Sequence, residues 1–156
     1  MSFRTTGEGY ALHHVINGYA WSALGAATVV DVGGSHGDAA FALAREFPHL
    51  QLVVQDLPQV VASCKEQPGL NVRFMSHDFF EEQPFRDAHV YLYRWIFHNW
   101  PDTALDVTML EIGNSKERDL DEWKQLFRQA DERYVFRGTT QPPGSNLAIL
   151  RADWSM

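Results

Sequence analysis

The stretch Val29-Val30-Asp31-Val32-Gly33-Gly34-Ser35-His36-Gly37 decides the fold expected of this chain. An apolar run ends at an acidic residue and breaks into a glycine-rich turn, and a helical pattern, Ala39–Arg45, follows at once. Glycines let the backbone turn sharply and approach a ligand closely. The pattern predicts a buried strand, a turn and a helix. Asp31 then stands at the strand's carboxyl end, where doubly wound α/β sheets bind small molecules.

A second apolar run, Leu50–Gln55, ends in Asp56. This acid lies about 20 residues beyond the glycines, where a ribose-binding carboxylate commonly stands. Glycines also occur in ordinary strand-to-helix turns, but the downstream acid favours a ligand site. The two features together predict an adenosine-containing ligand bound by a Rossmann-like fold.

Composition narrows the classes of partner. The 156 residues include 13 basic and 20 acidic side chains, a net charge of −7, so neither nucleic acid nor a membrane surface is expected as a partner. The single cysteine, Cys64, excludes an internal disulfide and suits a reducing compartment. With no membrane-length apolar run and no secretory signal in the first residues, a cytoplasmic location is expected. The histidines show no metal-ligand spacing, so no metal is expected.

Two domains are predicted, a helical lead segment over residues 1–27 and a Rossmann-like domain over residues 28–156. Further strands at Val72–Met75 and Ala88–Arg94 continue the alternation of strands and helices. Such alternation predicts an α/β fold with a mostly parallel sheet.

The C-terminal part has a different pattern. Asp119, followed three residues later by Glu122, is typical of a helix N-cap. Two short apolar runs, Arg133–Arg137 and Leu147–Arg151, flank a Pro-Pro-Gly turn. This arrangement predicts a helix followed by an antiparallel hairpin at the sheet edge.

Five motifs occur in a fixed order, which is more specific than any one of them: Asp31–Gly37, Val54–Pro58, Phe74–Phe80, Arg94–Trp100 and Gly113–Arg118. With this set, the chain resembles the catalytic domain of S-adenosylmethionine-dependent O-methyltransferases of the plant caffeate type. It is most similar to their fungal secondary-metabolism branch. The resemblance implies a class I methyltransferase sheet, S-adenosylmethionine as cofactor and a small-molecule substrate.

The resemblance also implies a set of cofactor-binding residues. The glycine turn would wrap the methionine part, Asp56 would hold the ribose, and the pair after the third strand would frame the adenine. The set is Asp31, Gly33, Gly34, Asp56, Leu57, Asp78, Phe79 and Arg94.

For catalysis, the resemblance implies His98 as the general base and Glu117 as the carboxylate that orients it. A phenol is a poor nucleophile until an imidazole removes its proton, and a carboxylate on the other ring nitrogen strengthens that base. A packed histidine and a solvated helix-start acid are the alternatives for these two residues. Residues assigned to the substrate pocket are Trp95, Met109 and Asn114.

Two departures from the family pattern are visible. Members of the family have a large helical domain before the glycine motif, whereas in this sequence a short helical lead is expected before it. After Leu105 the chain passes directly to Asp106, where the family has a helix, a strand and a loop. The sheet is therefore expected to lack one central strand. Either the final hairpin strand pairs with Val90–Tyr93, or two chains complete each other in a homodimer by exchanged or edge-paired elements.

These departures leave three functions open. The first is an O-methyltransferase acting on a hydroxyl of an aromatic or polyketide-type molecule. The second is an isomerase or cyclase on the same fold, in which His98 moves protons without methyl transfer. The third is a truncated pseudoenzyme that acts through association.

Overall fold

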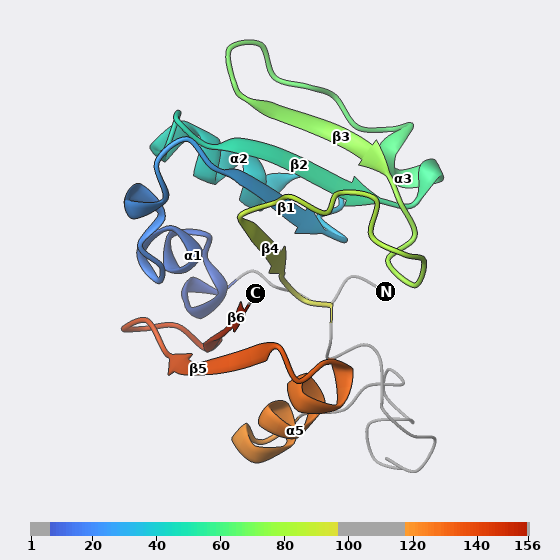
Figure 1. Ribbon diagram of the computed structural model, residues 1–156. Helices are drawn as coiled ribbons and strands as arrows, with labels where there is room; N and C mark the ends of the chain where they lie inside the picture. The colour runs from blue at the N-terminus through green and yellow to red at the C-terminus, as the bar shows by residue number, and fades with distance from the viewer. Residues whose placement is uncertain (1–6, 97–117, 156) are drawn as a thin grey trace. The chain divides into compact units, whose positions relative to one another are not determined.

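The computed structural model describes residues 7–96 and 118–155, and the chain divides into two compact units (Figure 1). One unit is Tyr19–Trp100, and the other joins Met1–Gly18 to Pro101–Met156. Among the helices that the structure describes, none is long and apolar enough to cross a membrane.

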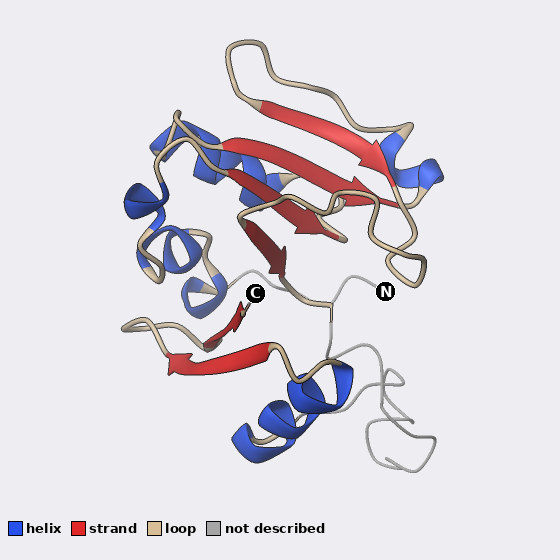
Figure 2. Ribbon diagram, viewed as in Figure 1, coloured by secondary structure: helices blue, strands red, loops and turns tan. Residues whose placement is uncertain are grey.

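The first unit is built on four parallel strands in the order β3-β2-β1-β4 (Figure 2). They are β1 (Thr28–Val32), β2 (Gln51–Asp56), β3 (Val72–Ser76) and β4 (Val90–Tyr93). Continuous Val and Leu runs suit a parallel sheet that is buried on both faces, and Val29, Val30 and Val32 are at most 1% exposed. The predicted α/β architecture is confirmed.

Helix α2 (Asp38–Glu46) covers one face of this sheet and begins directly after the glycine turn. Its Phe41 ring lies edge-on to Phe74 of β3, with 6.0 Å between the ring centroids, and Leu43 is fully buried. The predicted strand, turn and helix are thus confirmed. After β2 the crossover helix α3 (Pro58–Val61) is a single turn, and its proline occupies a first-turn position that needs no N–H donor.

The opposite face is covered by the segment 77–89, here called the connector, which joins β3 to β4. Because these strands lie at opposite edges of the sheet, the connector crosses β2 and β1 (Figure 1). Its Phe79 and Phe85 pack against a cluster formed by Val30, Val32 and Val53. Within residues 77–89 the chain forms no helix, so loop side chains close this face.

The second unit contains helix α5 (Leu120–Ala130) and the antiparallel hairpin β5 (Tyr134–Thr140) and β6 (Ile149–Trp154). The Asp119 side chain accepts the Glu122 N–H at 2.9 Å, and the Glu122 carboxylate accepts the Asp119 N–H at 2.8 Å. The predicted cap is therefore confirmed as a capping box. Among the described strands, β5 and β6 form a sheet of their own and do not pair with β4.

The lead segment forms three short helical pieces. They are η1 (Glu8–Tyr10) and α1 (His13–Asn17) in the second unit, and η2 (Trp21–Leu24) in the first. Gly18 ends α1, and a Cβ at this position would lie 2.1 Å from Cδ1 of Ile149. The absence of a side chain at Gly18 therefore lets β6 approach the end of α1.

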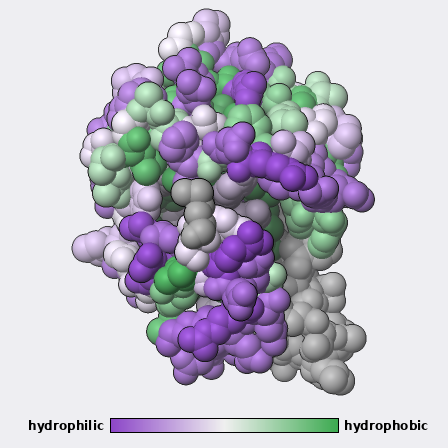
Figure 3. Space-filling view, viewed as in Figure 1, coloured by the Kyte–Doolittle hydropathy of each residue, from purple (hydrophilic) through white to green (hydrophobic). Residues whose placement is uncertain are grey.

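Hydrophilic side chains occupy much of the face seen in Figure 3, with smaller apolar areas between them. Across the described residues, five large apolar side chains are exposed: Leu57, Phe80, Tyr93, Leu120 and Trp154. Leu57 and Phe80 follow the carboxyl ends of β2 and β3, at the edge where the sequence predicts a ligand.

Candidate functional site

The expected cofactor residues all gather at one edge of the four-stranded sheet. Because the strands are parallel, their carboxyl ends meet there, and each strand leads into a segment that carries members of the set. The members are Asp31, Gly33, Gly34, Asp56, Leu57, Asp78, Phe79 and Arg94, and Trp95, expected in the substrate pocket, follows Arg94 at the same edge.

The glycine turn folds back over the end of β2. Both the Gly33 and Gly34 N–H groups donate to the Gln55 carbonyl oxygen, at 2.8 and 3.1 Å. Gly33 has a φ of 68°, the left-handed region that glycine adopts without strain. A Cβ on Gly34 would lie 2.6 Å from Oδ2 of Asp31, closer than such atoms approach. The turn therefore requires glycine at Gly34 for space and favours it at Gly33 for conformation.

Ser35 continues the turn. Its φ of 52° is also left-handed, which costs a serine about 1 kcal/mol or more. The conformation is held by Asp56, whose Oδ2 accepts the Ser35 N–H at 2.8 Å. The Ser35 and Ser63 hydroxyls lie 3.1 and 3.4 Å from the two ring nitrogens of His36, linking the turn to the end of α3.

Asp56 stands between the turn and α3. One carboxylate oxygen accepts the Ser35 N–H, and the other accepts the Leu57 N–H at 2.8 Å. Each oxygen of an ionised carboxylate has a second lone-pair site. Asp56 can therefore hold the turn in shape and still accept hydrogen bonds from a pair of ribose hydroxyls.

Asp31 is the electrostatically unusual residue of the site. It is only 2% exposed, and its Oδ2 has no hydrogen-bond partner among the described residues. Burial raises the pKa of Asp31 to about 7, opposed by the charge of Arg94 and reinforced by that of Asp56. Burial also lowers the pKa of Arg94, against the charge of Asp31. A buried carboxylate with an unsatisfied oxygen is a place where a cationic ligand group would be stabilised.

The segments after β3 and β4 complete this edge. The Asp78 carboxylate accepts the Phe80 N–H at 3.0 Å, and the Phe79 and Phe80 rings lie 4.7 Å apart. Phe79 packs on the core, whereas Phe80 is 65% exposed. After Arg94, Trp95 has a left-handed φ of 62°, a strained conformation for a bulky residue. Backbone strain of this kind occurs most often at active sites and ligand-binding sites.

These residues fit an S-adenosyl cofactor on observations of this chain alone. The glycine turn provides a cradle that a Cβ at Gly34 would fill, and Asp31 presents an unsatisfied buried oxygen beside it. Asp56 supplies acceptors at the neighbouring strand end. Across residues 7–96 and 118–155, no group of three His, Cys, Asp or Glu side chains could hold a metal ion.

A family model of the O-methyltransferase domain matches residues 9–106. The chain belongs to the O-methyltransferase domain family. The match ends one residue beyond Leu105, where the sequence predicts a missing segment.

Curated relatives agree with this assignment. The O-methyltransferase gsfB of Penicillium aethiopicum is 36% identical over 188 residues, covering 94% of this chain and 45% of the relative. The chain thus spans about half the length of the curated relatives it matches, from 44% to 56% for the eight compared. An alignment of 188 residues exceeds the chain's own 156, so gsfB carries residues within the aligned region that this chain lacks. This agrees with the predicted internal deletion.

Solved structures share the fold. The mitomycin 7-O-methyltransferase MmcR superposes with a TM-score of 0.77 at 22% identity, covering 92% of this chain and 53% of that one. A pericyclic reaction enzyme superposes with a TM-score of 0.66 at 21% identity, covering 97% of this chain and 48% of the other. The class I methyltransferase fold predicted from the sequence is confirmed by these neighbours.

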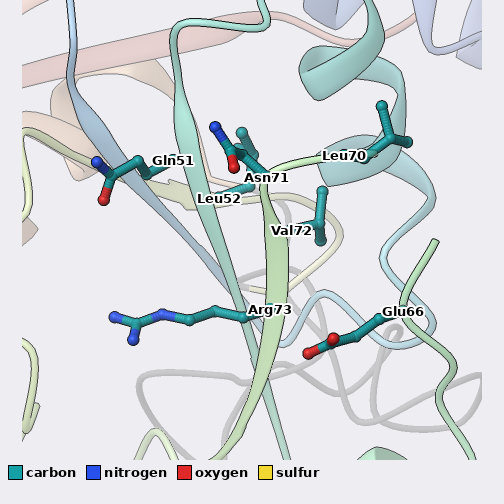
Figure 4. Close-up of a pocket in the computed structure, with 7 residues that line it drawn as sticks. All are labelled: Gln51, Leu52, Glu66, Leu70, Asn71, Val72 and Arg73. Atoms are coloured by element: carbon teal, nitrogen blue, oxygen red, sulfur yellow. The ribbon is translucent and has the colours of Figure 1, made fainter. Parts of the chain in front are cut away.

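Four of the expected site residues lie outside the described part of the chain: His98, Met109, Asn114 and Glu117. Their roles therefore stay predictions from the sequence. A pocket of about 340 Å³ lies at the opposite, amino-terminal ends of β2 and β3 and contains none of the expected residues (Figure 4). It is lined by Gln51, Leu52, Glu66, Leu70, Asn71, Val72 and Arg73.

Sequence reasoning missed two residues that support the site. Gln55, near the carboxyl end of β2, is only 1% exposed, and its side-chain amide pairs with that of Gln83 in the connector. The available signal was a glutamine inside a Val-Val-Gln-Asp run, where an apolar residue is expected on a parallel strand.

Proposed function

We propose that this chain binds S-adenosylmethionine and transfers its methyl group to a hydroxyl of an aromatic or polyketide-type small molecule. The observation that carries the proposal is the glycine turn held beside the buried Asp31, whose Oδ2 has no hydrogen-bond partner among the described residues. The methionine part of this cofactor ends in an ammonium group, which is the kind of cation that such a carboxylate would stabilise.

Residues at the carboxyl ends of the other strands bind the remaining parts of the cofactor. Asp56 accepts the ribose hydroxyls, and Leu57, 38% exposed beside it, packs against the nucleoside. Asp78 and Phe79 frame the adenine, and the exposed Phe80 adds an apolar surface next to them. Arg94, partly buried near Asp31, balances the negative charge of the site.

In the reaction, the bound cofactor supplies an electrophilic methyl group on a sulfonium. His98 removes the proton of the substrate hydroxyl as its oxygen attacks, and Glu117 orients the imidazole. Trp95, Met109 and Asn114 hold the substrate so that the oxygen approaches in line with the methyl group.

A second function is favoured by one observation. The same fold, with 97% of this chain covered, occurs in a pericyclic reaction enzyme. A non-methylating isomerisation or cyclisation with His98 as the proton-moving group is therefore the competing proposal. The two differ in their products, because methyl transfer adds one methyl group to the substrate and isomerisation leaves its mass unchanged.

The proposal includes a homodimer in the cytoplasm. In the described part of the chain, β4 is the last strand of its sheet and the hairpin forms a separate sheet, which supports exchange or edge pairing of elements between two chains. The one cysteine, Cys64, is free and partly exposed, which suits a reducing compartment.

Calorimetric titration of the purified chain with S-adenosylhomocysteine tests the cofactor site. Micromolar or tighter binding is expected, and absence of binding at millimolar ligand would refute the site. Candidate phenols are then incubated with S-adenosylmethionine, and products are weighed by mass spectrometry. Replacing His98 with alanine should abolish turnover while leaving the binding of S-adenosylhomocysteine intact, and full retained turnover would remove His98 from the mechanism.

A further inference from the structure

A pair of side-chain amides joins the connector to the sheet, next to the apolar packing of Phe79 and Phe85 and the hydrogen bond that the Tyr91 hydroxyl donates to the Phe85 carbonyl oxygen. Gln55 projects from β2 on the same face as Val53, two residues before it, and the register places it beside Val32 of β1 and Met75 of β3. A primary amide buried among such neighbours costs several kcal/mol unless its hydrogen bonds are made. A glutamine at this position is therefore tolerated only if another group forms hydrogen bonds with its amide.

That partner is Gln83 of the connector. The Gln55 Nε2 donates to Gln83 Oε1 at 2.8 Å, and the Gln83 Nε2 donates back to Gln55 Oε1 at 2.9 Å. The same Gln83 oxygen accepts the Phe85 N–H at 3.1 Å. The reciprocal pair thus fixes both the side chain and the local backbone of the connector, because each hydrogen bond has a direction that apolar packing lacks.

The main chain of Gln55 contacts the glycine turn. Its carbonyl oxygen accepts the N–H groups of Gly33 and Gly34, which define the glycine turn. One residue therefore contacts the turn through its backbone and the connector through its side chain. The connector in turn begins with Asp78 and Phe79, the residues proposed to frame the adenine.

We propose that the Gln55–Gln83 amide pair is a positioning element that sets the Asp78–Phe79 segment relative to the glycine turn, and so determines the affinity for the adenosyl group. This inference rests on the proposed function, since it assumes that the adenosyl group binds at this edge. Neither amide is assigned a contact with the cofactor. The pair acts through the spacing of the two segments.

The test compares Gln55→Met, Gln83→Met and the double variant with the wild-type chain. Methionine keeps nearly the volume of glutamine but removes the amide. Each single variant leaves one amide without its partner, so its free energy of unfolding should fall. In the double variant two apolar side chains face each other, and stability should recover in part, because the amides are no longer unpaired but the Phe85 N–H still lacks its acceptor.

Affinity for S-adenosylhomocysteine, measured by calorimetry, should behave differently. All three variants should bind about tenfold more weakly, because none retains the directional pair. Hydrogen exchange of the amides in residues 77–89 should be faster in all three. Gln51→Met, on an exposed residue at the start of β2, is the matched control and should leave both properties unchanged.

The outcomes separate this inference from the proposed function. If the wild-type chain binds but affinity is unaltered in the variants, or recovers with stability in the double variant, the pair is structural only and the inference is wrong. If the wild-type chain does not bind, the proposed function fails and the inference fails with it. Should the double variant not fold, Gln83→Asn retains an amide on a shorter arm and should still bind about tenfold more weakly; wild-type affinity in this variant would overturn the inference.

Discussion

Replacing Asp31 with asparagine should stabilise the chain at neutral and alkaline pH while weakening its cofactor site. In the folded chain the pKa of this carboxyl is about 7, against 3.8 for an unperturbed aspartate. A folded-state pKa above the unfolded one means that the native chain holds its proton more tightly. The contribution of the group to stability is therefore fully present below pH 3.8 and is lost as the pH rises through 7.

The magnitude follows from the two pKa values. Ionisation of Asp31 favours the unfolded chain over the native chain by about 4 kcal/mol at pH 8 and by about 2 kcal/mol at pH 5. Asparagine has nearly the shape of a protonated aspartate and does not ionise. The Asp31→Asn variant should therefore exceed the wild type in stability by a margin that grows by about 2–3 kcal/mol from pH 5 to pH 8.

Urea unfolding of both chains across this pH range measures the margin, and Asp87→Asn, at an exposed carboxylate of the connector, is the control. The same Asp31→Asn variant should bind S-adenosylhomocysteine at least about tenfold more weakly, because a neutral amide does not balance the ammonium group. Parallel stability curves for variant and wild type, or a variant less stable at pH 8, would refute the buried-carboxylate argument.

Three further predictions concern single residues. Asp56→Ala should weaken binding of S-adenosylhomocysteine by about 1–3 kcal/mol, since charged hydrogen bonds to the ribose and to the turn are lost together; unchanged affinity in a calorimetric titration would contradict the ribose role. Gly34→Ala should lower the free energy of unfolding by about 1–3 kcal/mol, because its Cβ would lie 2.6 Å from Asp31 Oδ2 and 2.9 Å from Val54 Cγ1; a chain as stable as the wild type in urea would show that the turn has room there. Asp119→Ala should destabilise the second unit by about 0.5–2 kcal/mol through loss of the capping box; an unaltered thermal unfolding curve would show that α5 does not depend on its cap.

Local patterns were sufficient to predict much of this fold. The Val29–Gly37 stretch predicted β1, its turn and α2 because apolar runs, glycines and helix formers act over a few residues. The Asp119 cap followed from one residue and its partner three positions later. The gathering of Asp31, Asp56 and Arg94 at one edge followed from parallel topology, which places all carboxyl ends together.

Features that depend on distant contacts were not accessible in this way. The close approach of Ile149 to Gly18, far apart along the chain, is one example, because a side chain at residue 18 would overlap Ile149. The pairing of Gln55 with Gln83 joins residues 28 positions apart through a loop whose path no periodicity reveals. The sequence also did not reveal that β5 and β6 form a sheet of their own, because strand propensity does not specify which strands pair.

The central position of β1 has a consequence for the order in which the unit can assemble. Its partner on one side, β2, follows closely in the chain, but its partner on the other side is β4. The bond from the Thr28 N–H to the His89 ring nitrogen, which marks the start of this second pairing, spans 61 positions. During synthesis, β1 therefore cannot complete its hydrogen bonds on this side until Val90–Tyr93 has been made. A fragment that stops short of Val90 retains the glycine turn, Asp31 and Asp56 but leaves the strand that carries Asp31 with one open side.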